Sequence, residues 1–97
     1  MTRRLFQPGD TVKHFKRELV ADKTSNEYLY SIIGTARHTE TKEELMIYVP
    51  LYDTDCVKGV DAVVRPLEMF YSEVDHVKYP NIKQKYRFEL YNKGEEL

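Results

Sequence analysis

The sequence predicts a mainly β protein, a small SH3-like antiparallel barrel or roll with one short helical turn near residues 66–70. Short aromatic and β-branched runs recur between turn signals, which is typical of short strands. No amphipathic stretch reaches the length of about 12 residues that a crossover helix needs, so an alternating β–α architecture is excluded. A chain of 97 residues suffices for one domain with one hydrophobic core, so we expect residues 1–97 to form a single domain.

Two strong strand patterns lie in the middle of the sequence. The run YLYSIIGTAR (28–37) is aromatic and β-branched, and Gly34 within it predicts a bulge or bend. The run ELMIYVPLY (44–52) alternates between two faces. Pro50 should mark a strand end or a sheet edge, because proline donates no ladder hydrogen bond. A polar five-residue connection (39–43) joins the two runs, so we expect a hairpin.

The flanking segments predict shorter elements. We expect strands at 11–15, 62–65 and 85–91, and a loop with a brief strand at 18–21. Pro66 suits the first position of a helical turn, and an acidic residue in that turn favours the helix dipole.

Cysteine usage and hydropathy predict the compartment. Cys56 is the single cysteine, so no intramolecular disulfide can form. The start MTRRLFQPGD has no apolar run behind its arginines, and no stretch approaches the roughly 18 apolar residues of a membrane helix. We therefore expect a cytoplasmic protein with no membrane partner.

Charge is distributed unevenly along the chain. The net charge is −1, which argues against strong nucleic-acid binding. Residues 1–23 carry six Lys/Arg and three Asp/Glu, and residues 76–97 carry five and three, whereas residues 24–75 carry four and ten. If the terminal strands pair in space, they form one modestly basic face. Ordinary solvated faces are the alternative.

Three segments together resemble a bacterial family known as domain of unknown function 1653. They are GDTVKHFK, YSIIGTARHTETKEELMIYVPLY and VRPLEMF, within residues 9–75. The resemblance implies an SH3-type β-barrel and no established activity. The chain departs from the family pattern at Arg17, where the family usually has glycine, and in a C-terminal extension, 78–97, for which the alternating run 85–91 predicts an extra strand.

The segment GTARHTETKEEL (34–45) carries a dense charged cluster. With His38 and Glu44 flanking the loop, Arg37 would face Leu45 across the ladder. Arg65 needs an acceptor, which a glutamate carboxylate could supply through a bidentate fork. One interpretation is a polar clasp that pins the hairpin turn and has no chemical role.

The functional interpretation is a non-enzymatic binding site for a small anionic ligand. Its candidate residues are Arg37, His38, Glu40, Glu44, Arg65, Glu68, His14 and Lys16. The runner-up is a small hydrolase or transferase that uses His38 with a glutamate. The sequence contains no metal-ligand spacing and no phosphate-binding loop, so we expect no cofactor and no metal.

An aromatic surface offers a second class of function. Its members are Tyr28, Tyr30, Tyr48, Tyr52 and Tyr71. Such a surface would suit a protein or peptide partner or, less favoured here, nucleic acid. A C-terminal strand that adds to a neighbour's open edge would produce a homodimer. Simple sheet packing is the alternative that requires no partner.

Overall fold

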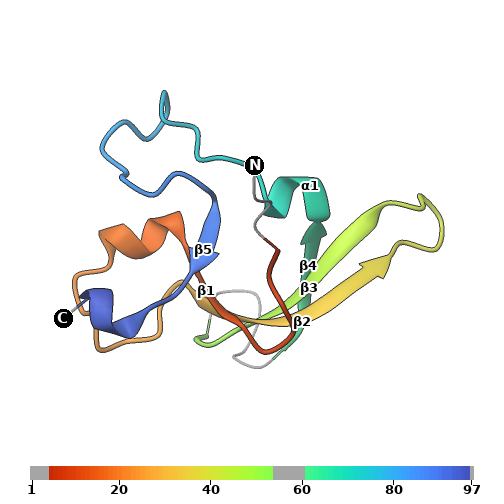
Figure 1. The fold of residues 1–97 in the computed structure, drawn as a ribbon, viewed down its shortest axis with the longest axis horizontal. Helices are drawn as coiled ribbons and strands as arrows, with labels where there is room; N and C mark the ends of the chain where they lie inside the picture. The colour runs from red at the N-terminus through yellow and green to blue at the C-terminus, as the bar shows by residue number, and fades with distance from the viewer. Residues whose placement is uncertain (1–4, 54–60, 97) are drawn as a thin grey trace.

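The computed structural model describes residues 5–53 and 61–96, and it is built on one five-stranded antiparallel sheet (Figure 1). The strands are β1 (Thr11–His14), β2 (Leu29–Arg37), β3 (Glu44–Pro50), β4 (Val63–Pro66) and β5 (Phe88–Leu90), in the spatial order β4-β3-β2-β1-β5. The mainly β prediction is confirmed. The sheet is rolled but not closed into a barrel, because no ladder joins β4 to β5 in the described part of the chain.

The helices of the described residues are short. They are the 3-10 helices η1 (Phe15–Leu19) and η2 (Lys93–Glu96) and the single α-helical turn α1 (Leu67–Phe70). The turn α1 lies where the sequence predicts one, directly after Pro66. No helix in these ranges is long and apolar enough to cross a membrane.

The β2–β3 hairpin projects from the body of the protein (Figure 1). Its ladder shifts register between Ile32 and Gly34, so the predicted bulge is confirmed. The predicted register beyond the bulge is wrong by one residue, because Arg37 pairs with Glu44. The reason is the turn, in which Lys42 adopts a left-handed backbone (φ 67°) and reverses the chain one residue earlier than expected.

The segment after β1 forms η1, so the brief strand predicted at 18–21 is wrong. His14 Nδ1 accepts a hydrogen bond from the Lys16 N–H (3.1 Å) and caps the helix. The side chain of Arg17 is buried and donates to the carbonyl oxygens of Ser25 and Glu27, each at 2.8 Å. Arg17 therefore holds the loop between η1 and β2.

The hydrophobic core is mainly aromatic and joins the two edges of the rolled sheet. The rings of Phe70 from α1 and Phe88 from β5 stack with centroids 4.0 Å apart, and both contact the Tyr48 ring of β3. Because α1 directly follows β4, this stack brings the β4 end of the sheet against β5. Aromatic side-chain packing thus holds the two edges of the sheet together, as a ladder of hydrogen bonds would in a closed barrel.

The segment between α1 and β5 folds back over η1 (upper left in Figure 1). Val74 packs with Phe15 and Ile82 in a second small core. The Glu18 carboxylate of η1 accepts hydrogen bonds from the backbone N–H groups of Lys83 and Gln84. These contacts place the C-terminal basic residues beside those of β1 and η1.

Candidate functional site

The eight predicted site residues lie in three separate places. Arg37, His38 and Glu40 lie at the exposed end of the hairpin, Glu44 and Glu68 line an acidic hollow at its base, and His14, Lys16 and Arg65 line a basic pocket.

The hairpin end has the properties of a polar turn. His38 is exposed, and its Nδ1 accepts hydrogen bonds from the backbone N–H groups of Glu40 (3.1 Å) and Thr41 (3.2 Å). Arg37 pairs loosely with Glu44 at 4.0 Å, and both side chains are more than half exposed. No carboxylate oxygen contacts His38 in the described part of the chain, so the His38–glutamate dyad is not formed. The polar-clasp interpretation describes this cluster.

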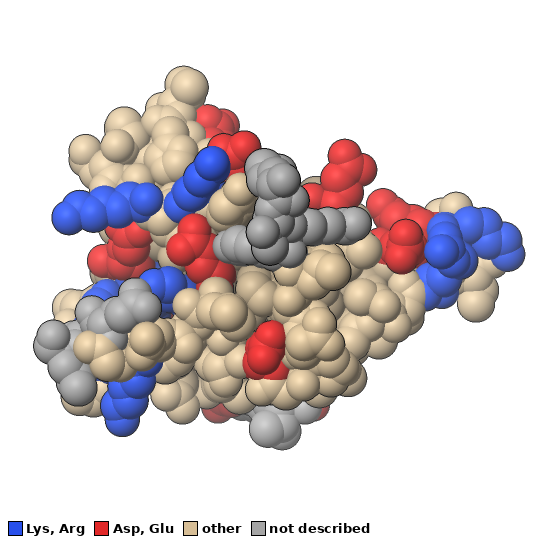
Figure 2. Space-filling model, viewed as in Figure 1, with Lys and Arg blue, Asp and Glu red and all other residues tan. Residues whose placement is uncertain are grey.

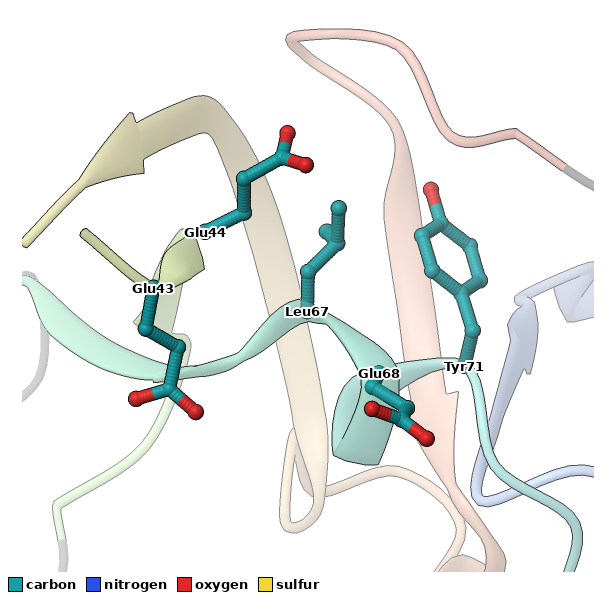
Figure 3. Close-up of a pocket in the computed structure, with 5 residues that line it drawn as sticks. All are labelled: Glu43, Glu44, Leu67, Glu68 and Tyr71. Carbon is teal, nitrogen blue, oxygen red and sulfur yellow. The ribbon is translucent and has the colours of Figure 1, made fainter. Parts of the chain in front are cut away.

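The acidic hollow has a volume of about 430 Å³ and is lined by Glu43, Glu44, Leu67, Glu68 and Tyr71. Figure 3 shows that the three carboxylates around Leu67 point in different directions and do not converge. In Figure 2, Asp and Glu side chains gather where the hairpin leaves the body of the protein, and Lys and Arg side chains gather at the hairpin end. A hollow lined by three carboxylates repels anions, so Glu44 and Glu68 do not belong to an anion site. In the ranges the structure describes, no group of three or more His, Cys, Asp or Glu is placed to hold a metal.

The basic pocket lies beside the paired strands β1 and β5 and has a volume of about 370 Å³. Its lining residues are His14, Phe15, Lys16, Arg65, Val74, Asp75, Lys78, Tyr79 and Arg87. They come from β1, η1, β4, the segment that covers η1, and the residue before β5. Four of them are permanent cations and one is a carboxylate, so the pocket carries an excess of positive charge.

Neutral groups hold Arg65 in place. Its Nε donates a hydrogen bond to the Tyr48 hydroxyl (3.0 Å), and its Nη1 donates to the Met69 Sδ (3.6 Å). The guanidinium carbon lies 5.7 Å from the centroid of the Phe88 ring, within cation–π range. The fork with a glutamate, one of the partners that the sequence allowed for Arg65, does not form among the described residues. The aromatic core orients this arginine and leaves its charge uncompensated by the described carboxylates.

Arg87 is held in the same manner. Its Nε donates to the Ser72 hydroxyl (3.2 Å), and its backbone N–H donates to the Ser72 carbonyl (2.8 Å). Burial and then the positive charge of Arg65 lower the pKa of Arg87. Across residues 5–53 and 61–96, neither Arg65 nor Arg87 forms an ion pair. Two guanidiniums thus share one pocket and repel each other.

His14 is a neutral member of the pocket. Its ring is buried and lies between the rings of Phe15 (centroids 4.3 Å apart) and Phe88 (5.1 Å). Burial, followed by the charges of Arg65, Arg87 and Lys16, lowers the pKa of His14 to about 3. Because Nδ1 accepts the Lys16 N–H, the single ring proton lies on Nε2. His14 is therefore an uncharged N–H donor at neutral pH.

Two lysines complete the charge of the pocket. The Nζ atoms of Lys16 and Lys78 lie 5.9 and 5.5 Å from the centroid of the Tyr79 ring. Asp75 is the one carboxylate among the lining residues, and its Oδ1 accepts the backbone N–H groups of Val77 and Lys78. Asp75 therefore orders the loop, and it leaves three of the four cationic charges unbalanced.

Sequence reasoning missed Lys78 and Arg87, although a signal for them existed. The sequence predicts basic chain ends that form one face if the terminal strands pair, and β1 pairs with β5 in the structure.

Fold and pocket define a class: a small mainly β protein with a rolled antiparallel sheet and a basic pocket beside its paired strands β1 and β5. Residues 10–90 match the family described as "Protein of unknown function (DUF1653)", and the chain belongs to this family. The match continues to residue 90 and so includes β5 and both C-terminal cations of the pocket, beyond the residues 9–75 in which the sequence resemblance lies. A search of curated proteins and a search of solved structures returned no match.

Proposed function

We propose that this protein is a non-enzymatic binding module and that its basic pocket holds a small anionic ligand. One observation carries the proposal: Arg65 and Arg87 line the same concave pocket, and neutral partners fix both of them. Here no ion pair of either one is found in the described ranges.

The arrangement is pre-organised for an anion. A guanidinium presents five N–H donors in a planar fork that matches carboxylate and phosphate groups, and the structure uses only part of that fork internally. The arginines are already oriented, so binding does not have to restrict them again. An anion between them would also relieve their mutual repulsion. The pocket volume of about 370 Å³ lies in the range of small-ligand sites.

Catalysis is not part of this proposal. A general base works best when its pKa lies near the working pH. The pKa of His14 is lowered to about 3, so its ring is a weak base at neutral pH. His38, the residue of the alternative dyad, has backbone partners and an exposed position.

We further propose that residues 1–97 form one domain, that the rolled sheet is SH3-like, and that the protein acts in a bacterial cytoplasm. One sheet that includes strands from Thr11 to Leu90 supports the single domain. A single cysteine, Cys56, which lies outside the described residues, supports a reducing compartment. Family resemblance supports the bacterial origin.

The test measures stabilisation of the fold by an anion. Thermal unfolding followed by circular dichroism is compared in sodium sulfate and in sodium chloride of equal ionic strength. A ligand at about ten times its Kd stabilises the folded state by about 1.4 kcal/mol, which raises Tm by roughly 6 °C in a domain of this size. We expect this increase in the wild-type protein and a smaller one in Lys78→Gln.

The control is Lys83→Gln, which removes an exposed charge of the same segment outside the pocket. Sulfate stabilises many proteins by exclusion from their surface. Equal stabilisation of all three proteins would therefore attribute the effect to exclusion and contradict the proposal. Tighter binding of an oligonucleotide or an acidic peptide than of sulfate, abolished by Lys78→Gln, would replace the small anion by that partner.

A further inference from the structure

We propose that the ligand of the basic pocket is a phosphate monoester in its dianionic form, with the phosphate held between Arg65 and Arg87. This inference rests on the proposed function and deepens it by naming the chemical class of the anion. The supporting observations are the charge excess, the donor character and the size of the pocket.

The charge excess favours a dianion over a monoanion. Lys16, Arg65, Lys78 and Arg87 supply four positive charges against one negative charge from Asp75. A carboxylate ligand would offset one of the three excess charges, whereas a phosphate dianion offsets two. Two arginine forks also match the several acceptor oxygens of a phosphate better than the two oxygens of a carboxylate.

The hydrogen-bonding character favours the fully ionised phosphate. Besides the cations, the neutral His14 ring carries an N–H group at Nε2, because Nδ1 accepts the Lys16 N–H. The lining side chains offer few hydrogen-bond acceptors, namely the Tyr79 hydroxyl and the Asp75 carboxylate. Two backbone N–H groups already donate to Oδ1 of Asp75. A monoanionic phosphate carries a P–OH group that needs an acceptor. The dianion needs only donors, which the pocket supplies.

The size of the pocket favours an ester over inorganic phosphate. A volume of about 370 Å³ is larger than one phosphate group fills. The remaining wall consists of Phe15, Val74 and Tyr79, which are buried or half-buried. An ester substituent would therefore leave the phosphate between the arginines and contact this wall.

The experiment compares glycerol 3-phosphate with sulfate at pH 8 and pH 5 by calorimetric or NMR titration. Since the second pKa of a phosphate monoester is about 6, only about a tenth is dianionic at pH 5. We expect the affinity for glycerol 3-phosphate to fall about tenfold from pH 8 to pH 5. Sulfate stays a dianion throughout, so its affinity should change less than twofold if the protein groups of the pocket do not titrate.

One variant and one further anion sharpen the result. Asp75→Asn keeps an oxygen for the backbone N–H groups and removes the negative charge, so both dianions should bind about two- to fivefold more tightly. Acetate, a monoanion at pH 8, should bind at least about tenfold more weakly than sulfate.

Failure of this inference and failure of the proposed function give different results. Equal affinities for acetate, sulfate and glycerol 3-phosphate, all reduced by Lys78→Gln, would overturn the phosphate inference and retain the anion site. A pH-independent affinity for glycerol 3-phosphate would do the same. Binding that Lys78→Gln and Lys16→Gln both leave unchanged would overturn the anion site itself.

Discussion

A decrease in pH from 7 to 5 is expected to destabilise the folded protein by about 2 kcal/mol through His14 alone. The unfolded chain binds a proton at His14 with the ordinary pKa of 6.5, whereas the folded protein binds it only near pH 3. The contribution of His14 to the stability of the fold is therefore fully present above pH 6.5. It is lost progressively as the pH falls from 6.5 towards 3.

The magnitude follows from the width of this window. One pKa unit corresponds to 1.36 kcal/mol, and pH 5 lies about 1.5 units below the unfolded pKa, which gives about 2 kcal/mol. The physical cause is the burial of the ring, followed by the charges of Arg65, Arg87 and Lys16. A dianion bound between the arginines would offset those charges, so it should raise the pKa of His14.

Urea unfolding followed by tyrosine fluorescence measures the stability at each pH. The variant His14→Gln should lose about 2 kcal/mol less than the wild-type protein between pH 7 and pH 5. Lys83→Gln, a change at an exposed position outside the pocket, should behave like the wild-type protein. A ring-proton NMR titration in which His14 gains its proton near pH 6.5 would refute the reasoning.

Three further substitutions test the fold. Arg17→Met leaves several carbonyl oxygens without their donor, so it should lower the free energy of unfolding in urea by about 3 kcal/mol. Amide exchange in residues 20–27 should become faster. Unchanged exchange would contradict the role of Arg17. Gly34→Ala should cost about 1 kcal/mol through backbone conformation alone (φ 156°), since no atom lies within 4 Å of the added Cβ; unaltered stability would count against the bulge. Tyr30→Phe removes the 2.6 Å hydroxyl pair with Tyr52 and should cost about 1 kcal/mol, so an increase in stability would contradict that pair.

The sequence predicted those parts of the fold that depend on neighbouring residues. The alternation of 44–52 and the aromatic run 28–37 correspond to β3 and β2. Gly34 marks the bulge, Pro50 ends β3, and Pro66 precedes α1. In each case the backbone preference of a residue or the period of a short segment determines the local structure.

The parts that the sequence did not predict depend on distant contacts or on turn geometry. The sheet closes by the stacking of Phe70 on Phe88 rather than by a ladder, and no local pattern distinguishes these outcomes. The hairpin register depends on the left-handed backbone of Lys42, a residue type with no strong preference for it. The helix η1 depends on contacts of Arg17 with residues of the following loop.

The candidate site shows the same division. The hairpin end concentrates charge because an exposed turn must be polar, so its density of charged residues carried little functional information. Lys16 and Arg87 are far apart in the sequence, and they line the same pocket because β1 pairs with β5. The sequence signal for this site was the basic character of both chain ends. The neutral partners of Arg65 could not be predicted, since they depend on how β3 and α1 pack.

An NMR titration of the isotope-labelled protein with glycerol 3-phosphate at pH 8 tests the central claim most directly. The basic pocket predicts saturable shifts at Lys16, Arg65, Lys78 and Arg87, including the guanidinium Nε–H signals of both arginines. It also predicts little change at residues 37–44 of the hairpin. Saturable shifts confined to residues 37–44, or no saturable shift in the pocket, would contradict the account.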